Sequence, residues 1–249
     1  MIKIALFGAA GRMGRAVISA LDNEKDIRII HAVDVSRKVG EKIGSVILEG
    51  DLDAAEYHAD VWVDVSLPKP TLEHAEKANR LQIPILIGTT GFDSREMDQL
   101  QQLRVAHIIS PNLSPGINLL FEAVPLMRKI LGEKFDVAVS EIHHRYKVDA
   151  PSGTAIRLKE RLESISVNSL SGSRGISPVI QVTSLRLGEI VGEHRILLVS
   201  EGEEIEIIHR AHSRMAFASG VAPAVRFLAG KKEGTYTMAD VLGIKWQES

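Results

Sequence analysis

The stretch IKIALFGAAGRMG, residues 2–14, begins with six residues typical of a buried strand and continues into a turn with three glycines. A helical pattern, RAVISALDN (15–23), comes directly after it. Strand, glycine-rich turn and helix in this order are the context of a dinucleotide-binding fingerprint. The spacing departs from G-x-G-x-x-G, because taking Gly11 and Gly14 as the second and third glycines places Ala9 at the first position.

The turn and the start of the helix form a candidate site for a dinucleotide. Gly11 would let the backbone approach a pyrophosphate, and Gly14 would let the helix pack closely on the strand. The amino end of the helix offers free N–H groups and the positive end of its dipole, to which Arg12 adds charge. A tight turn without a ligand is the alternative. A P-loop is excluded because no G-K-[ST] follows the glycines.

The next apolar segment, IRIIHAVD (27–34), predicts a second strand that ends in an acid. Asp34 follows Gly14 by 20 residues, a spacing at which a carboxylate can accept hydrogen bonds from a ribose diol. This arrangement favours NAD over NADP, although Arg37 and Lys38 just beyond it could bind a 2′-phosphate instead.

Strands and helices alternate through the rest of the first half. We expect strands at 61–66, 83–88 and 106–112, and helices at 71–81 and 93–103. The alternation predicts an α/β fold with a Rossmann-type, doubly wound parallel sheet. Ligands bind outside the carboxyl ends of such strands, where the small polar loops GTTGF (88–92) and SPNLSPG (110–116) lie. Either loop alone is also compatible with an ordinary turn.

The pattern changes after Pro115. We expect a strand at 135–144, two or three extended segments within 179–211, and helices at 117–131 and 154–165. Strands that follow one another without helices between them predict a second, α+β domain with a mixed or antiparallel sheet. The pattern places the domain boundary near residue 115. A last helix, 218–231, could pack on either domain.

The composition excludes several classes of protein. A net charge of −2 without a long basic run argues against nucleic acid as a partner. With no cysteine, the chain has no disulfide, thiolate metal site or cysteine nucleophile. No apolar run approaches the length of a membrane span, and the N-terminal apolar run predicts a buried strand and not a signal peptide. We therefore expect a cytoplasmic protein without a membrane partner.

The stretch EIHHRYKVDAPSGTA (141–155) concentrates polar and basic groups. Adjacent side chains on a strand point to opposite faces, so an extended backbone would separate His143 from His144. That separation, the lack of an H-E-x-x-H spacing and the absence of cysteine argue against a metal site, and we predict none.

The segment DAPSGTA (149–155) predicts the start of a helix and, with it, an anion site. Ser152 or Thr154 can cap the helix, and Gly153 leaves room for an anion at the free N–H groups. An ordinary helix cap is the alternative. Lys147 and the two histidines add positive potential, which favours a small anionic substrate. A histidine and a lysine could also donate the proton that hydride transfer to a conjugated system requires.

This stretch resembles the signature of the 4-hydroxy-tetrahydrodipicolinate reductases, also called dihydrodipicolinate reductases, of bacterial lysine biosynthesis. The family signature is similar to E-x-H-H-x-x-K-x-D-A-P-S-G-T-A, and residues 141–155 match it at every fixed position. The resemblance extends over essentially the whole chain, through GAAGRMG (8–14), DVSLP (64–68), GTTGF (88–92), EIVGEH (189–194), HSRMAFASG (212–220) and G-x-Y-x-M-x-D-V-L (234–242). The segment near 166–178 is shorter than in longer members of the family.

The resemblance implies a role for each matching residue. His143 would be the proton donor or acceptor, and Lys147 a second proton donor. The substrate would be bound by His144, Ser152, Gly153, Thr154 and Arg214. NADH or NADPH would be held by Gly8, Ala9, Ala10, Gly11, Arg12, Met13, Asp34, Gly88, Thr89, Thr90, Ser110, Pro111, Asn112 and Leu113. Val35 stands where some members carry an arginine after the acid, which favours NADH.

The resemblance also implies the domain organisation and the substrate. The dinucleotide-binding domain would comprise residues 1–114 and 216–249, and the substrate-binding and oligomerisation domain residues 115–215. The substrate would be a small dicarboxylate, and the enzyme a homotetramer joined through the sheets of the second domain. From the residues alone, two alternatives stay open. One is another two-domain dehydrogenase, acting on an amino acid or a sugar, and the other is a module that binds the dinucleotide without turnover.

Overall fold

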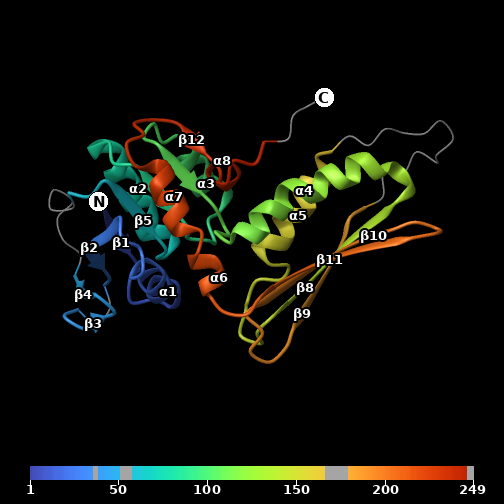
Figure 1. Ribbon diagram of the computed structural model, residues 1–249, viewed down its shortest axis with the longest axis horizontal. Helices are drawn as coiled ribbons and strands as arrows, with labels where there is room; N and C mark the ends of the chain where they lie inside the picture. The colour runs from blue at the N-terminus through green and yellow to red at the C-terminus, as the bar shows by residue number, and fades with distance from the viewer. Residues whose placement is uncertain (36–38, 51–57, 166–178, 246–249) are drawn as a thin grey trace. The chain divides into compact units, whose positions relative to one another are not determined.

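The computed structural model describes four stretches of the chain (Figure 1), residues 1–35, 39–50, 58–165 and 179–245. The chain divides into two compact units. The first unit contains Met1–Pro115 and Arg214–Ser249, and the second contains Gly116–Ser213. Some of the sequence predictions concern residues outside the described stretches, namely Arg37, Lys38 and the segment 166–178.

The first unit is built on a sheet whose strands run in the order β12-β7-β6-β5-β1-β2-β4-β3. All neighbours in it are parallel except β3 and β4, which form an antiparallel pair. The strands are β1 (Ile2–Phe7), β2 (Ile27–Val33), β3 (Lys42–Ile43), β4 (Val46–Glu49), β5 (Val61–Asp64), β6 (Ile85–Ile87), β7 (His107–Ile109) and β12 (Thr235–Tyr236). The chain leaves β1 toward one edge and returns at β5 to build the other edge. This confirms the predicted doubly wound sheet.

Helices cover both faces of this sheet (Figure 1). Side chains alternate along β1, so Ile4 and Leu6 join one apolar core while Ala5 and Phe7 join the other. The first core packs against α1 (Arg12–Leu21) and α7 (Val221–Leu228), and the second against α2 (Pro68–Leu81) and α3 (Ser94–Gln101). Because β1 is buried on both faces, its glycine turn emerges at the centre of the carboxyl edge, where ligands of such sheets bind.

Several elements differ from the sequence predictions. The short strands β3, β4 and β12 were not predicted, and α2 begins at Pro68 rather than at 71, because proline is well suited to the first turn of a helix. The predicted helix 218–231 is wrong as one element, since the chain forms α6 (Met215–Ala218) and then α7. The break lies at Gly220, whose backbone approaches the loop after β7 so closely that a Cβ there would lie 1.8 Å from the carbonyl oxygen of Leu113. A last short helix is α8 (Met238–Val241).

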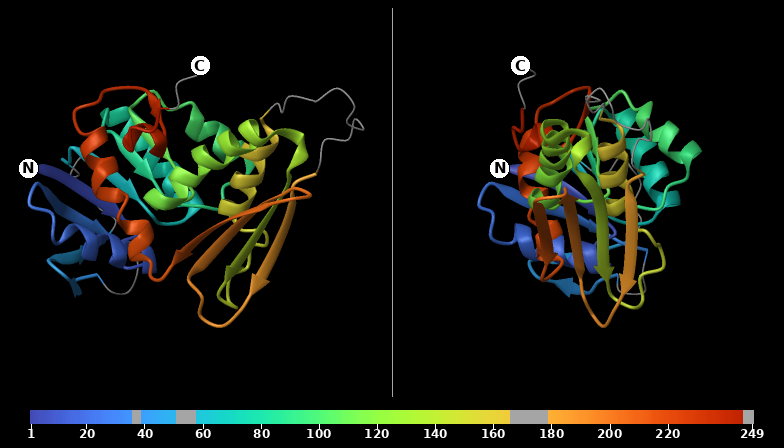
Figure 2. Two further views of the ribbon diagram at one scale, coloured as in Figure 1. Left: turned by 45° about the vertical axis from the view of Figure 1, so that its right-hand side comes forward. Right: turned by 90° about the vertical axis from the view of Figure 1, so that its right-hand side faces the viewer.

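The second unit is a four-stranded sheet with two helices along one face (Figure 2). The strand order is β11-β10-β8-β9, with β8 and β9 parallel and the other neighbours antiparallel, so the predicted mixed sheet is confirmed. Its elements are α4 (Pro115–Leu131), the 3-10 turn η2 (Gly132–Lys134), β8 (Asp136–His143), α5 (Gly153–Glu163), β9 (Gln181–Arg186), β10 (Gly192–Val199) and β11 (Glu204–Ala211).

The face of this sheet that packs against α4 and α5 changes character along β8. Val137 and Val139 belong to the apolar core, whereas Glu141 and His143, the next residues on the same face, are polar and buried. Directly opposite Glu141, His194 of β10 is also buried. The apolar core therefore ends in a buried polar cluster near the start of α5.

Candidate active site

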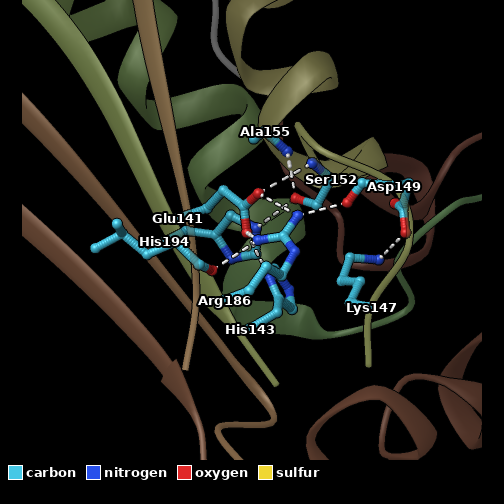
Figure 3. Close-up of polar contacts among 9 residues, drawn as sticks. Glu141, His143, Lys147, Asp149, Ser152, Ala155, Arg186 and His194 are labelled. Carbon is cyan, nitrogen blue, oxygen red and sulfur yellow. Dashed lines mark hydrogen bonds and ion pairs between the residues drawn. The ribbon is translucent and has the colours of Figure 1, made fainter. Parts of the chain in front are cut away.

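The centre of the polar cluster is the carboxylate of Glu141, which is fully buried in β8. Arg186 of β9 donates to both of its oxygens, from Nη2 to Oε1 at 2.8 Å and from Nη1 to Oε2 at 2.9 Å (Figure 3). The backbone N–H of Ser152 donates to Oε1 at 3.2 Å, and Nδ1 of His143 hydrogen-bonds to Oε2. A two-pronged arginine pair of this kind fixes the plane of the carboxylate as well as its charge.

These contacts determine the ionisation of the cluster. Burial acts to raise the pKa of Glu141, but the hydrogen bonds from Arg186 and His143 outweigh it and lower that pKa to about 2. Burial lowers the pKa of the His143 imidazole, although Glu141 acts in the opposite direction. Glu141 is therefore a carboxylate at neutral pH and can only accept, so the Nδ1–H group of His143 is the donor of the hydrogen bond between them. The Nε2 atom of His143 is left for proton transfer.

The polar cluster continues into the amino end of α5. Ser152 caps this helix, since its hydroxyl oxygen accepts a hydrogen bond from the N–H of Ala155 at 3.3 Å. The same hydroxyl lies 3.3 Å from Nε2 of His194. Burial, and then the neighbouring His143, lower the pKa of His194 to about 3, so its ring is neutral and can accept the hydroxyl proton. Gly153, the first residue of α5, is exposed, and a Cβ there would meet no atom of the described residues within 4 Å.

The other residues of the signature lie on the loop between β8 and α5. Nζ of Lys147 forms an ion pair with Asp149 at 2.8 Å, a partner that the sequence did not reveal. His144 follows the last residue of β8, and its ring centroid lies 6.4 Å from that of Tyr146, whereas the His143 ring contacts His194 at 5.2 Å. The two adjacent histidines thus have different surroundings.

The glycine turn of the first unit has the geometry of a phosphate cradle. Gly8 has a φ of +79°, and a Cβ there would lie 2.8 Å from the Cα of Ser66. At Gly14 a Cβ would lie 2.2 Å from the carbonyl oxygen of Gly8, so α1 packs against the turn as closely as backbone allows. No side chain among the described residues caps α1, whose first N–H groups therefore remain available to an anion. These features fit a dinucleotide.

The structure corrects one detail of the predicted fingerprint. The spacing of the glycines in the sequence placed Ala9 at the position of the first glycine of the fingerprint, the residue that makes the tight turn. In the structure Gly8 makes that turn, because it alone in the turn has the left-handed backbone conformation. Ala9 is instead a buried part of the core, and the N–H of Ala10 donates to Asp34 at 2.9 Å. The carboxylate of Asp34 thus lies beside the turn.

The remaining residues predicted to bind the cofactor lie in loops that follow β6 and β7. Thr89 is buried and its hydroxyl bonds to the fully buried Asp64 at 3.2 Å, whereas Thr90 is exposed. In the second loop, the Ser110 hydroxyl donates to the carbonyl oxygen of Asn112 at 2.7 Å. The two loops approach closely at Gly88, where a Cβ would lie 3.2 Å from Cδ1 of Leu113. Pro111 is exposed.

Arg214, predicted to reach the substrate, belongs to the first unit, where it precedes α6. Burial lowers the pKa of its guanidinium group, and the positive charge of Arg12 acts in the same direction. The two arginines are therefore close enough to interact, at the amino end of α1. The sequence predicted a role for each of them but did not predict that they are neighbours.

Sequence reasoning missed three members of the polar cluster, Glu141, Arg186 and His194. Glu141 stands in the signature, and its spacing of two from His143 on a strand placed both on one face. His194 lies in the segment EIVGEH, one of the motifs that resemble the family, but the resemblance implied no role for it. Nothing in the sequence marks Arg186, because its link to Glu141 depends on the pairing of β8 with β9.

Comparisons with known proteins agree with this architecture. A family model described as "Dihydrodipicolinate reductase, N-terminus" matches residues 2–113, and one described as "Dihydrodipicolinate reductase, C-terminus" matches residues 116–242. The 4-hydroxy-tetrahydrodipicolinate reductase of Nitrosomonas europaea is 37% identical over 265 residues, covering 98% of this chain and 99% of the relative. The enzyme of that name from Methanocaldococcus jannaschii is 37% identical over 270 residues, covering 98% of both chains.

Among solved structures, a "Dipicolinate bound Dihydrodipicolinate reductase" from Paenisporosarcina sp. TG-14 superposes with a TM-score of 0.75 at 25% identity, covering 98% of this chain and 100% of that one. A myo-inositol dehydrogenase from Corynebacterium glutamicum, at 12% identity and a TM-score of 0.63, covers 97% of this chain and 92% of its own, and shares the fold alone. Both halves of the chain match one family of oxidoreductases, and its named relatives match over nearly their full length. The chain therefore belongs to the dihydrodipicolinate reductase family.

Proposed function

We propose that this chain reduces 4-hydroxy-tetrahydrodipicolinate to tetrahydrodipicolinate, in the diaminopimelate route to lysine, with NADH or NADPH as reductant. The observation that carries the proposal is the buried Glu141–His143 pair beside the amino end of α5. It combines a proton-transfer group with a site for a carboxylate within one cluster. The names of the relatives supply the identity of the substrate.

The substrate is a small dicarboxylate, and the second unit is its proposed binding domain. The exposed Gly153 opens the first N–H groups of α5 to one carboxylate, and the buried Ser152 cap holds that helix end in place. Lys147 adds a positive charge near the same loop. His144, Thr154 and Arg214 complete the proposed set of substrate ligands.

The first unit is the proposed dinucleotide-binding domain. The turn at Gly8 and the amino end of α1 would hold the pyrophosphate. Asp34 would accept hydrogen bonds from the ribose diol, and the exposed Val35 offers no positive charge to a 2′-phosphate, which favours NADH. The remaining cofactor contacts are proposed at Ala9, Ala10, Gly11, Arg12, Met13, Gly88, Thr89, Thr90, Ser110, Pro111, Asn112 and Leu113.

The residues of the polar cluster supply the proton for the reduction. When bound, the dinucleotide supplies a hydride to the ring carbon beta to the imine carbon of the unsaturated substrate, and water leaves during the process. The resulting enamine takes a proton on carbon from Nε2 of the protonated His143 ring, which keeps its Nδ1 proton in the hydrogen bond to Glu141. Lys147 assists as a second donor, and the positive charges of the cluster stabilise the dicarboxylate.

The assembly and the location of the enzyme follow from the same proposal. The sheet of the second unit would join four copies of the chain into a homotetramer, which light scattering of the purified protein measures. No helix within the described residues has the length and apolar character needed to cross a membrane. We propose a cytoplasmic enzyme.

A spectrophotometric assay tests the function. The substrate is made in place by condensing pyruvate with aspartate semialdehyde, and the oxidation of NADH or NADPH is followed separately. Rapid oxidation that depends on the condensation product is expected, with NADH preferred. His143→Gln is the matched control for background oxidation. Oxidation with other oxo or imino acids, but not with this substrate, would refute the proposal.

A further inference from the structure

Arg186 is linked to the proton-transfer histidine through a single carboxylate. It donates to both oxygens of Glu141, which in turn accepts from Nδ1 of His143. Within the described residues no hydrogen bond joins Arg186 to His143 directly. Arg186 also donates to the backbone carbonyl of Asp149, on the loop that leads to α5 (Figure 3). Arg186 is therefore linked by hydrogen bonds to the reacting group, the His143 ring, only through Glu141.

We propose that Arg186 is a positioning residue of the reaction: it holds Glu141 as a carboxylate so that Nδ1 of His143 keeps its proton and Nε2 is the atom that transfers one. The inference deepens the proposed function by naming what sets the tautomer of His143. It is independent of which substrate receives the proton.

The chemistry of a buried carboxyl group supports this role. Glu141 is fully buried, and a carboxylate without a cation in such a place takes up a proton instead. A protonated carboxyl donates a hydrogen bond, so the neutral His143 ring would then accept at Nδ1 and carry its proton on Nε2. In that tautomer Nε2 already carries the ring's only proton, so it cannot take up a second proton from solvent to form the imidazolium that donates to the substrate. The two-pronged contact from Arg186 keeps Glu141 from taking up a proton, because it neutralises the carboxylate charge and donates a hydrogen bond to each oxygen.

The other side of the ring lies beside Gly192 of β10. A Cβ on Gly192 would lie 3.1 Å from Nε2 of His143, so only a glycine leaves ordinary space there. The ring thus has Glu141 at Nδ1, and the missing side chain of Gly192 leaves space beside Nε2. In each turnover Nε2–H gives its proton to the substrate carbon and the ring returns to the neutral Nδ1–H form. It regains the lost proton from solvent.

A double-mutant cycle tests whether Arg186 acts through Glu141. The variants are Glu141→Gln, Arg186→Met and the double variant, and the double variant leaves no buried charge unpaired. Glu141→Gln should lower kcat by about 100-fold, the loss that a misplaced transferring atom produces, with a smaller change in KM. Adding Arg186→Met to it should change kcat by no more than about twofold, because the residue that transmits the effect is already gone. Fully additive losses would overturn the proposal and assign Arg186 to the loop at Asp149.

A second measurement does not depend on turnover. The ¹⁵N chemical shifts of His143 in the resting protein, above the pKa of the ring, should show Nδ1 protonated and Nε2 bare. In Arg186→Met the Nε2–H form should dominate, and Arg186→Lys should restore part of the Nδ1–H form. Arg226→Met is the matched control, since Arg226 makes a two-pronged pair with Asp26 on the surface of the first unit. An unchanged His143 tautomer in a folded Arg186→Met protein would overturn the proposal, whether or not the chain reduces the proposed substrate.

Discussion

Replacing Gly192 with alanine should separate the stability of the enzyme from its activity. Gly192 begins β10, and its backbone is not in a conformation reserved for glycine. A Cβ would lie 3.1 Å from Nε2 and 3.3 Å from Cδ2 of His143, which is closer than nearly all real Cβ contacts. The ring must therefore give way by a few tenths of an ångström. It cannot slide toward Glu141, because that carboxylate is held by Arg186.

The expected magnitudes follow from this geometry. A glycine in a strand costs about 0.5–1 kcal/mol relative to alanine, which offsets part of the strain at the His143 ring. The free energy of unfolding should thus change by less than about 1 kcal/mol, or roughly 2–4 °C in Tm. A displacement of 1 Å at a reacting atom costs about 100-fold in rate, so a few tenths of an ångström at Nε2 should cost roughly 4- to 10-fold in kcat.

The assay compares kcat and Tm of Gly192→Ala with those of Gly202→Ala. Gly202 lies in the turn between β10 and β11. A Cβ there would meet nothing within 4 Å in the part of the chain that the structure describes, so that variant should match the unmodified enzyme in both measurements. A Gly192→Ala enzyme with kcat within twofold of the unmodified enzyme would refute the claim that the His143 ring is confined. A large fall in Tm would instead show that the sheet cannot accept the methyl group.

Three further changes have defined outcomes. His143→Gln should lower kcat by about 100-fold or more with a modest change in KM, because the general acid is lost but the carboxylate sites remain. Gly8→Ala should cost more than about 1–2 kcal/mol, since alanine is strained at a φ of +79° and its Cβ would lie 2.8 Å from Ser66; thermal unfolding and dinucleotide titration measure it. The pKa of Glu141 is lowered from 4.5 to about 2, so its contribution of about 3 kcal/mol is present above pH 4.5 and lost as the pH falls toward 2. Urea unfolding from pH 6 to pH 2 should show this loss in the unmodified chain and not in Glu141→Gln.

The sequence predicted the parts of the fold that are written in periodic patterns. Apolar runs of five or six residues after turns marked the long strands, and the glycine turn marked the start of α1. The strands β3 and β12, of two residues each, carry too few residues for a period to be visible. The break at Gly220 was hidden for another reason. It depends on the close approach of the Leu113 carbonyl, a contact between segments about 100 residues apart in the chain.

The same distinction explains the candidate site. His143, Lys147 and Ser152 lie within one short stretch, so their proximity could be inferred from the sequence. The pairing of Glu141 with Arg186 could not be inferred. Arg186 comes near Glu141 and His143 only through the parallel pairing of β8 with β9, which places it opposite His143. Strand register therefore decides which cation meets the carboxylate.

That register also links the core to the chemistry. In β8 the residues on the helix-covered face change from Val137 and Val139 to Glu141 and His143, while β9 brings Arg186 level with His143. A slip of one residue would turn the valines away from the core and Glu141 away from Arg186 in the same step. The apolar burial of Val137 and Val139 thus stabilises the one register in which the carboxylate has its cation. The proton-transfer atom is positioned by the packing of the sheet as well as by its own hydrogen bond.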